Sequence, residues 1–349
     1  MRVLVATDAW HPQVNGVVRT YERLAEEARK LNHEILFLEP GAFRTLPCPT
    51  YPEIRLALIG PRAVRERVAN YQPDHIHIAT EGPIGLMMRR FCLKKKYRFT
   101  TSFHTRFPEY VAARFPVKLS WCYALQRWFH NSGDGIMIAT QSLAHELKER
   151  GFNPLLPWSR GVDIELFRPR NVRLFGSGGP VFLYVGRVAI EKNIEAFLRL
   201  DLPGKKVVVG DGPQRKALMA KYPDAIFTGP KQGVELADHY ASADVFVFPS
   251  VTDTYGIVLL EALASGLPIA ALPVTGPKDI VRPGETGILD EDLGSAARAA
   301  QKLDPNHCRR QAETYSWAKC ANQFFDNIAS VYKGADANVP RATEIAGLT

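Results

Sequence analysis

Two acids and a glycine in residues 252–268 have the types and spacing to bind a phosphorylated sugar. Asp253 and Glu261 stand eight positions apart, and Gly256 lies between them in a turn that leads into an apolar helical pattern. Eight positions span a little over two helical turns, so Asp253 precedes the helix start and Glu261 projects from its body. The free N–H groups of a first helical turn suit an anion, and a glycine lets a ligand approach the backbone closely. We therefore predict a sugar-nucleotide site, whose turn residues are Thr254, Tyr255, Gly256 and Ile257.

A pair of cations occurs in a matching position earlier in the chain. The apolar run 181–185 ends at Gly186, and Arg187 and Lys192 follow on the turn between this predicted strand and the next helix. Arginine offers a planar fork of donors and lysine a mobile point charge, so together they could neutralise a diphosphate. Their position directly after a strand favours this role over that of two solvated surface charges.

The elements that must position these residues alternate between strands and helices. In the first half we predict strands over residues 3–7, 35–38, 76–79, 99–103 and 136–139, and helices over residues 17–31, 63–71, 84–95 and 143–150. In the second half we predict strands over residues 182–185, 207–209, 226–228, 245–248 and 269–272. This alternation is typical of doubly wound, Rossmann-like α/β domains, whose ligands bind at the carboxyl ends of parallel strands.

The length of 349 residues is enough for two such domains. The stretch 167–180 is rich in Pro, Gly and Ser, and we read it as a linker between a first domain, residues 1–168, and a second, residues 177–316. Two domains of this kind facing each other would leave a cleft in which a donor and an acceptor meet. Residues 334–349 contain few apolar side chains, which indicates a loose tail.

Composition excludes several other classes of protein. No run of about 18 apolar residues occurs, so we expect no membrane-spanning helix. Residues 1–10 resemble a first strand more than a signal peptide. The five cysteines are scattered and form no Cys-x-x-Cys motif, which favours a reducing cytoplasm over a disulfide framework or a zinc site.

Three motifs, in this order along the chain, resemble the retaining glycosyltransferases of family 4, which have the GT-B fold. They are Ser102-Phe103-His104-Thr105, the cation turn Gly186-Arg187 with Glu191-Lys192-Asn193, and the acid pair Asp253 and Glu261. The likeness covers roughly residues 1–330, with one departure, since the family usually has Glu where this chain has Asp253. The resemblance implies an enzyme that moves a hexose from a UDP or GDP sugar to a hydroxyl group and retains the anomeric configuration.

The resemblance also implies roles for individual residues. His104 would orient the donor sugar, Glu261 would hold the ribose, and Asp253 would hold the sugar hydroxyls. Arg187 and Lys192 would balance the charge that grows on the leaving diphosphate, and the leaving phosphate would take the proton of the acceptor. Backbone amides at Gly16 would contact the diphosphate, the loop with Lys231 would lie near the base, and a final helix over residues 317–333 would return to the first domain. The expected catalytic residues are His104, Arg187, Lys192 and Asp253.

The remaining motifs give no reason to expect a cofactor or a metal. His75 and His77 could be half of a metal site, but the sequence offers no third ligand with them. Gly210-Asp211-Gly212 lacks the third glycine of a dinucleotide fingerprint, because Arg215 stands in its place. Asp290-Glu291-Asp292 precedes a helical pattern, where acids cap the free N–H groups and favour the helix dipole. We therefore predict no cofactor and no metal, since the two cations can supply the charge.

Positive charge and aromatic residues gather in the first half of the chain. The net charge is +8, and residues 1–165 hold 23 Lys and Arg against 16 Asp and Glu. Cations attract anionic headgroups and aromatic rings settle at the membrane interface, so we predict a surface for a membrane and a lipid acceptor. A solvated helix end beside an ordinary core helix is the alternative, and no motif suggests nucleic acid. The residues expected to form this surface are Arg89, Arg90, Lys94, Lys95, Lys96, Tyr110, Arg114 and Trp121.

The predicted function is hexose transfer to a hydroxyl of a membrane lipid such as diacylglycerol. We expect a cytoplasmic enzyme that is bound peripherally to the inner face of the cell membrane. A soluble or polysaccharide acceptor is an alternative. A sugar-nucleotide epimerase, which would need no acceptor, and a non-catalytic nucleotide-binding or membrane-surface module are two more.

Overall fold

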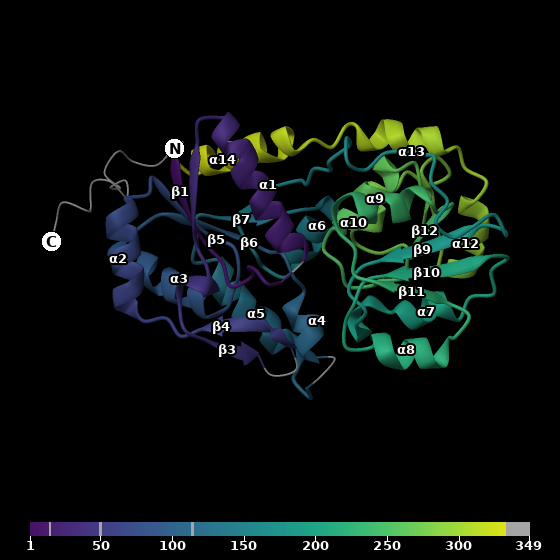
Figure 1. Cartoon of the computed structure of the whole chain (residues 1–349). Helices are drawn as coiled ribbons and strands as arrows, with labels where there is room; N and C mark the ends of the chain where they lie inside the picture. The colour runs from purple at the N-terminus through teal and green to yellow at the C-terminus, as the bar shows by residue number, and fades with distance from the viewer. Residues whose placement is uncertain (14, 49–50, 113–114, 333–349) are drawn as a thin grey trace. The chain divides into compact units, whose positions relative to one another are not determined.

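The chain forms two compact units, and each has its own sheet and core. The computed structural model describes residues 1–13, 15–48, 51–112 and 115–332 (Figure 1). The first unit contains Met1–Ser159 and the chain from Trp317 onward, and the second contains Arg160–Ser316. The chain therefore leaves the first unit once and returns to it near its end.

A parallel sheet organises the first unit. Within the described residues it has six strands, in the order β2-β1-β5-β6-β7-β8. They are β1 (Arg2–Ala6), β2 (Glu34–Leu38), β5 (His75–Ile78), β6 (Phe99–Ser102), β7 (Gly135–Ile138) and β8 (Leu155–Pro157). All neighbouring pairs are parallel. Along β1, Leu4 joins the core on one face and Val3 and Val5 join the core on the other, as the two-residue period of a strand requires.

Helices cover both faces of this sheet. They are α1 (Gly16–Lys30), α2 (Pro61–Tyr71), α3 (Pro83–Lys95), α4 (Phe107–Ala112), α5 (Leu119–His130), α6 (Gln141–Glu149) and α14 (Trp317–Tyr332), with the short 3-10 turn η1 (Pro40–Ala42). Val64 of α2 and Met88 of α3 pack in the core that contains Leu4. Tyr21 of α1 and Phe324 of α14 pack in the other core, so the last helix of the chain completes the first unit.

The second unit repeats this architecture with a sheet in the order β11-β10-β9-β12-β13-β14. Its strands are β9 (Val181–Val185), β10 (Lys205–Val209), β11 (Ile226–Gly229), β12 (Val245–Phe248), β13 (Ile269–Ala271) and β14 (Gly287–Leu289). Its helices are η2 (Ile190–Lys192), α7 (Ile194–Leu198), α8 (Arg215–Lys221), α9 (Gly233–Ala241), α10 (Ile257–Ala264), α11 (Pro277–Ile280), α12 (Leu293–Ala300) and α13 (Pro305–Ala312). All neighbouring strands are again parallel.

The sequence patterns missed several short elements. Strands β8 and β14 have three residues each and were not predicted, whereas β13, which is equally short, was predicted. An antiparallel hairpin of β3 (Thr45–Cys48) and β4 (Tyr51–Ala57) was not predicted either. The units divide between Ser159 and Arg160, which is earlier than the expected linker at 167–180. That stretch lies in the second unit, where the buried Phe167 ring packs edge-on against Tyr240 at 5.6 Å.

No helix in the described part of the chain is both long and apolar enough to cross a membrane.

Candidate active site

The strand order of the second sheet reverses between β9 and β12. From β9 the chain proceeds to β10 and β11 on one side, and from β12 to β13 and β14 on the other. The loops that follow two such strands separate at the carboxyl edge of the sheet, and ligands of open α/β sheets bind there. The loop after β9 carries Arg187 and Lys192, and the loop after β12 carries Asp253 and leads into α10. The predicted cation turn and acid segment therefore meet at this reversal point.

The Lys192 ammonium group forms an ion pair with the Asp253 carboxylate across 61 positions of the chain. Their side chains are only 19% and 17% exposed. Two further bonds join the same loops, from the Thr252 hydroxyl to the Glu191 carbonyl at 3.0 Å and from the Asn193 amide to the Pro249 carbonyl at 3.2 Å. Within the described residues, the second Asp253 oxygen, Oδ2, is buried and has no hydrogen-bond partner. Asp253 thus has one oxygen on the Lys192 ammonium group and a second oxygen with spare acceptor capacity.

Gly256 is the N-cap of helix α10, and its φ of +87° lies in the left-handed region. A Cβ atom at this position would lie 3.1 Å from Leu259 Cδ1 and 3.2 Å from the Phe248 ring, so both conformation and space favour glycine. The first N–H groups of an α-helix have no partner inside the helix. Among the other turn residues, Tyr255 is buried, whereas Thr254 and Ile257 are half-buried. This helix start can therefore offer N–H groups to an anion next to Lys192 and Asp253.

The other predicted site residues of the second unit, Glu261, Arg187 and Lys231, lie in different environments. Glu261 projects from α10 into a buried environment, where it accepts a hydrogen bond from the Tyr240 hydroxyl at 2.8 Å. Arg187 is half-buried, and its carbonyl accepts a bond from the Tyr184 hydroxyl at 2.9 Å. The Lys231 ammonium group pairs with Glu235, one turn along α9. Lys231 therefore has a local partner, whereas Lys192 and Asp253 pair at the reversal point and Arg187 lies on the same loop as Lys192.

In the first unit, Gly16 lies at the start of α1 and is exposed. The N-cap residue, Asn15, accepts hydrogen bonds from the N–H groups of Val17 and Val18, both at 3.0 Å. Two N–H groups of the first turn are thus already bonded to a side chain, which leaves less of this turn for a phosphate than the glycine alone suggests.

His104 follows strand β6 and is half-buried. Its Nε2 atom lies 3.0 Å from the hydroxyl of Tyr21, which projects from α1. The two rings meet edge to face at 5.5 Å. The strand end therefore places the predicted imidazole on the ligand side of the first sheet, with one ring nitrogen held by a buried tyrosine.

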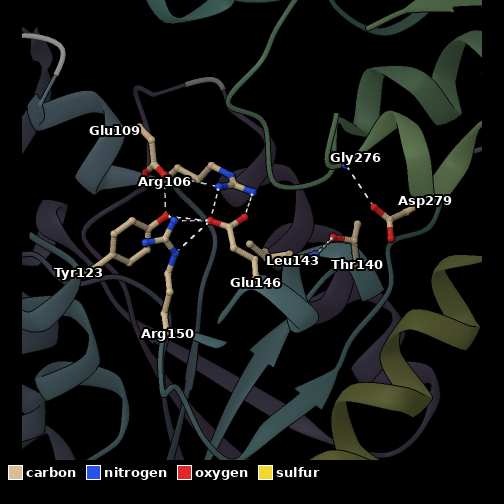
Figure 2. A network of polar contacts seen from close by, with 9 residues as sticks. All are labelled: Arg106, Glu109, Tyr123, Thr140, Leu143, Glu146, Arg150, Gly276 and Asp279. Atoms are coloured by element: carbon tan, nitrogen blue, oxygen red, sulfur yellow. Dashed lines mark hydrogen bonds and ion pairs between the residues drawn. The ribbon is translucent and has the colours of Figure 1, made fainter. Parts of the chain in front are cut away.

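The segment after His104 is fixed by an ion-pair network (Figure 2). Arg106 binds Glu146 of α6 through both of its terminal nitrogens, at 3.0 and 2.7 Å. Arg150 approaches the same carboxylate at 3.2 Å, and the Tyr123 hydroxyl donates to Glu109 at 2.6 Å. Burial opposes the charge on Glu146, but the bonds and charge of Arg106 outweigh it and hold the pKa of Glu146 below its usual range. Two residues beyond the imidazole, the backbone is thus anchored to a neighbouring helix.

Asp8 occupies the corresponding reversal point of the first sheet, between β1 and β5. Its buried carboxylate accepts bonds from the N–H groups of Ile84 and Gly85, at 2.8 and 3.2 Å, and from the Thr80 hydroxyl at 2.9 Å. Burial nevertheless raises the pKa of Asp8 to about 6. The start of α3 is therefore already occupied by this side chain, which fixes the helix to the strand end.

With this geometry in view, the chain can be compared with known proteins. The description "Glycosyltransferase Family 4" matches residues 14–166, and "Glycosyl transferases group 1" matches residues 179–304. A GDP-mannose-dependent alpha-mannosyltransferase of Mycobacterium tuberculosis is 30% identical over 315 residues, which cover 83% of each chain. The chain belongs to the family 4 glycosyltransferases.

Two further relatives support the enzyme class and the fold. An alpha-monoglucosyldiacylglycerol synthase of Streptococcus pneumoniae is 28% identical to this glycosyltransferase and covers 78% of this chain and 71% of its own. A solved sucrose-phosphate synthase of Thermosynechococcus elongatus is 20% identical and superposes with a TM-score of 0.76 over 96% of this chain and 100% of that chain. The predicted GT-B architecture of two Rossmann-like domains is confirmed.

The residues predicted to form a membrane surface on this glycosyltransferase do not all reach the surface. Arg89 is buried, where it stacks on the Trp128 ring at 3.7 Å and donates to the carbonyls of Phe129 and Trp128 and to the Ser132 hydroxyl. Its long side chain therefore joins α3 to α5 and is not available to a headgroup. Arg90, Lys94, Lys95, Lys96 and Trp121 are exposed, and Tyr110 is half-buried. Arg114 lies outside the described residues.

The motifs set aside in the sequence have structural partners. The ring nitrogens of His75 and His77 both bond to the Thr100 hydroxyl, and no group of three or more potential metal ligands occurs among the described residues. Asp292 caps α12 by accepting bonds from two N–H groups at 2.9 and 3.1 Å, as predicted. A Cβ atom at Gly210 would lie 1.9 Å from the Gly186 carbonyl oxygen. This glycine therefore lets the loop after β10 pack tightly beneath the cation turn.

Sequence reasoning missed the side chains that hold the site residues in place. Asn15 could have been recognised, because Asn is a favoured N-cap before a helix. Tyr21 and Tyr240 occupy apolar positions of helical patterns, and a buried tyrosine hydroxyl needs a partner, but the sequence does not say which one. Arg106 and Glu146 are 40 positions apart, so only the fold could pair them.

Proposed function

We propose that this glycosyltransferase moves a hexose from a UDP or GDP sugar to a lipid hydroxyl, with retention of the anomeric configuration. The observation that carries the proposal is the Lys192–Asp253 pair at the reversal point of the second sheet, next to the start of α10. A hexosyl diphosphate requires three partners, which are a cation, a helix start and a carboxylate oxygen with spare acceptor capacity.

Each residue then has one task. Lys192 and Arg187 neutralise the diphosphate as negative charge grows on it, which is worth most in a site of low water content. Glu261 accepts from the ribose hydroxyls, Asp253 accepts from a hexose hydroxyl, and the task of His104 is to orient the donor sugar. The bond between the hexose C1 and the phosphate oxygen breaks, a bond from C1 to the acceptor oxygen forms on the same face, and the acceptor proton passes to the leaving phosphate. No metal is required in this scheme.

The identity of the acceptor is inferred from a surface of the first unit and from the names of relatives. Among the matched proteins are a diacylglycerol glucoside synthase and a GDP-mannose-dependent enzyme, which support a lipid acceptor and a hexose donor. A groove of about 570 Å³ lies between α3 and α5 and is lined mainly by apolar side chains, including Leu86, Leu93 and Trp128. These three side chains are exposed.

The exposed charges of these stretches are all positive. Apart from the buried Arg89 and from Arg98, which pairs with Asp134 at 3.3 Å, residues 86–98 contain four cations and residues 115–130 contain two more, and neither stretch contains an acid. On the exposed face of α5, Trp121 is 66% and Leu125 is 64% exposed. Cations around an uncovered apolar face complement an anionic lipid surface, on which the enzyme would bind peripherally.

A donor panel tests the reaction. Full-length protein is incubated with UDP-glucose, UDP-galactose, GDP-glucose or GDP-mannose and vesicles that contain diacylglycerol, and the lipids are examined by mass spectrometry. We expect one donor to add a hexose mass to the lipid, with the anomeric configuration of the donor found by NMR. Inversion of configuration, or no glycolipid from any donor, would contradict the proposal. A donor isomerised in the absence of vesicles would indicate an epimerase.

A sedimentation experiment tests the membrane surface separately. The triple variant Lys94→Gln, Lys95→Gln, Lys96→Gln removes three exposed charges, each worth about 1 kcal/mol near an anionic membrane. Its partitioning to anionic vesicles at low salt is expected to fall by about two orders of magnitude. The control variant Lys216→Gln, Lys302→Gln, Arg310→Gln removes three exposed charges from the second unit and is expected to bind normally. Equal losses in both variants would mean that the effect is one of net charge alone.

A further inference from the structure

Glu81 lies beyond the carboxyl end of β5, three residues after the last residue of that strand, Ile78. The order of the first sheet reverses between β1 and β5, so the loop with Glu81 leaves the sheet at the edge where ligands of open α/β sheets bind. The Glu81 side chain is 15% exposed. It is therefore a partly accessible carboxylate at the ligand edge of the first unit, and the proposed function has not used it.

Two buried side chains of α5 hold one oxygen of this carboxylate. The His130 Nε2 atom lies 3.0 Å from Glu81 Oε1, and Gln126 Nε2 donates to the same oxygen at 3.1 Å. His130 is completely buried, and its Nδ1 atom lies 2.9 Å from the Thr101 hydroxyl of β6. A carboxylate only accepts, so both nitrogens face Glu81 with a proton. The orientation of Glu81 is thus fixed by α5 and β6.

The second oxygen of Glu81 and the amide oxygen of Gln126 remain open. Among the described residues, Glu81 accepts hydrogen bonds only through Oε1, which leaves Oε2 for a ligand. Gln126 is 6% exposed, and its Oε1 atom is buried and has no partner in the same part of the chain. Because the nitrogen of this amide contacts Glu81, the two open acceptors lie close together. A buried acceptor without a donor costs free energy, which a donating ligand would recover.

Two neighbouring acceptors suit a ligand that donates hydrogen bonds. Hydroxyl groups can donate to them, whereas an ionised phosphate only accepts and is repelled by the charge of Glu81. The nearby start of α3, which could bind a phosphate, is already filled by the carboxylate of Asp8. This edge therefore fits an uncharged group with hydroxyls and does not fit a phosphate.

The apolar groove between α3 and α5 comes close to this carboxylate. Pro83, the first residue of α3, lines the groove and is two residues away from Glu81. A lipid with a chain in the groove can therefore bring its head group to Glu81. In the proposed function the reacting hydroxyl of the acceptor gives its proton to the leaving phosphate, so Glu81 must bind a different hydroxyl.

We propose that Glu81 accepts a hydrogen bond from a hydroxyl of the acceptor that does not react, and that the preferred acceptor is a lipid with an uncharged head group of two or more hydroxyls. This inference rests on the proposed function and specifies its acceptor. His130 and Gln126 are positioning residues, because they hold one oxygen of Glu81 and direct the other to the ligand.

The wild type alone gives the first test. Full-length protein is supplied with the donor that the panel identifies and with monooleoylglycerol or propylene glycol monooleate, in vesicles of phosphatidylcholine and phosphatidylserine. These two acceptor lipids have the same acyl chain and differ by one hydroxyl. We expect kcat/KM to be at least about tenfold higher for monooleoylglycerol, the usual size of the effect of a hydrogen bond to a charged group. Equal values for the two lipids overturn the inference.

The variant Glu81→Gln assigns this preference to one residue. His130 and Gln126 both need an acceptor, so they should hold the oxygen of the new amide and leave its NH₂ group to face the ligand. The open acceptor is then replaced by a donor. We expect the preference for monooleoylglycerol to fall to within about twofold, while kcat/KM for propylene glycol monooleate and the KM for the donor stay unchanged. A preference that survives in Glu81→Gln overturns the inference.

The matched control is Glu27→Gln on α1. The Glu27 side chain is also 15% exposed and pairs with a single cation, Lys30, at 2.6 Å. This variant is expected to keep the wild-type preference, and an equal loss in both variants overturns the inference. Should Glu81→Gln fail to fold, the comparison of the two lipids with the wild type still decides the outcome.

A third lipid tests the requirement for an uncharged head group. Phosphatidylglycerol has two hydroxyls in its head group and a phosphate beside them. We expect its kcat/KM to be no higher than that of propylene glycol monooleate, and a value equal to that of monooleoylglycerol overturns this part of the inference. If neither of the two uncharged lipids accepts a hexose, the inference fails, and the diacylglycerol panel decides the proposed function separately.

Discussion

At the scale of single residues, the Lys192–Asp253 pair shows how one site can treat phosphate and sugar differently. The two charges neutralise each other, which reduces the cost of burying them. In the proposed function, a diphosphate would share Lys192 with Asp253, whereas a hexose hydroxyl would donate to the remaining carboxylate oxygen. In the proposed function, the acid is therefore expected to weaken phosphate binding slightly and to contribute to sugar binding.

The variant Asp253→Asn separates these two effects. It keeps the shape of the side chain and removes the charge that competes with phosphate for Lys192. We expect the affinity for free UDP or GDP to be unchanged or higher by calorimetry, while hexose transfer falls at least tenfold. Loss of nucleotide binding to the same extent as transfer would contradict the role assigned to Asp253.

At the scale of elements, strands β5 and β6 carry a polar stripe through an otherwise apolar interior. His75, His77 and Thr100 are buried between strands whose other side chains form the core. Their hydrogen bonds satisfy one another, so the stripe costs little and it connects α1 to α14. The stripe lowers the stability of the folded protein only when His75 must take up a proton.

The pH dependence of stability tests this stripe. In the unfolded chain His75 takes up a proton near pH 6.5, but burial lowers its pKa in the folded protein to about 3. The unfolded state therefore binds more protons between these values, and stability is lost as the pH falls through this window, at roughly 1.4 kcal/mol per pH unit.

The comparison is made between the wild type and His75→Gln by urea unfolding from pH 7 to pH 4. We expect the free energy of unfolding to fall more steeply with falling pH in the wild type than in His75→Gln. Asp8, whose raised pKa has the opposite effect on stability, is present in both proteins, so its contribution cancels when the two slopes are compared. Parallel curves would show that His75 is not neutral and buried in solution.

The elements also show what a sequence can and cannot specify. The long strands and helices, the turn at Gly256 and the cation turn after β9 follow from apolar periodicity and glycine placement, which are local properties. The three-residue strands β8 and β14 were not predicted, and each pairs with a longer or equally short neighbour, β7 and β13. Arg89 likewise cannot be told from the neighbouring cations in the sequence. Its side chain is buried because it stacks on the Trp128 ring and donates to the Phe129 carbonyl, and only the fold brings these residues together.

At the scale of the whole molecule, the chain closes the first unit with its last described helix. Phe324 of α14 is fully buried, with its ring 5.0 Å from that of Trp158 and 5.1 Å from that of His77. Trp158 also donates through its indole nitrogen to the Cys320 carbonyl at 3.1 Å. The first unit therefore depends on a segment that follows the entire second unit in the chain.

Removal of this one ring tests that dependence. Phe324→Ala should destabilise the first unit by about 3–5 kcal/mol, the usual cost of deleting a buried phenylalanine ring. Chemical denaturation with spectroscopic detection measures the change, and Phe115→Ala, at an exposed position, should leave stability almost unchanged. A loss below about 1 kcal/mol for Phe324→Ala would show that α14 is not part of this core.

The central claim is that a nucleoside diphosphate binds beside α10 through the cations that follow β9. Isothermal titration calorimetry of UDP and GDP tests it with the full chain, the double variant Arg187→Gln, Lys192→Gln, and the control Lys216→Gln. We predict binding of at least one nucleotide to the wild type and the control, and an affinity at least tenfold lower in the double variant. Absence of binding to the folded wild type, or equal affinity in all three proteins, would contradict the account.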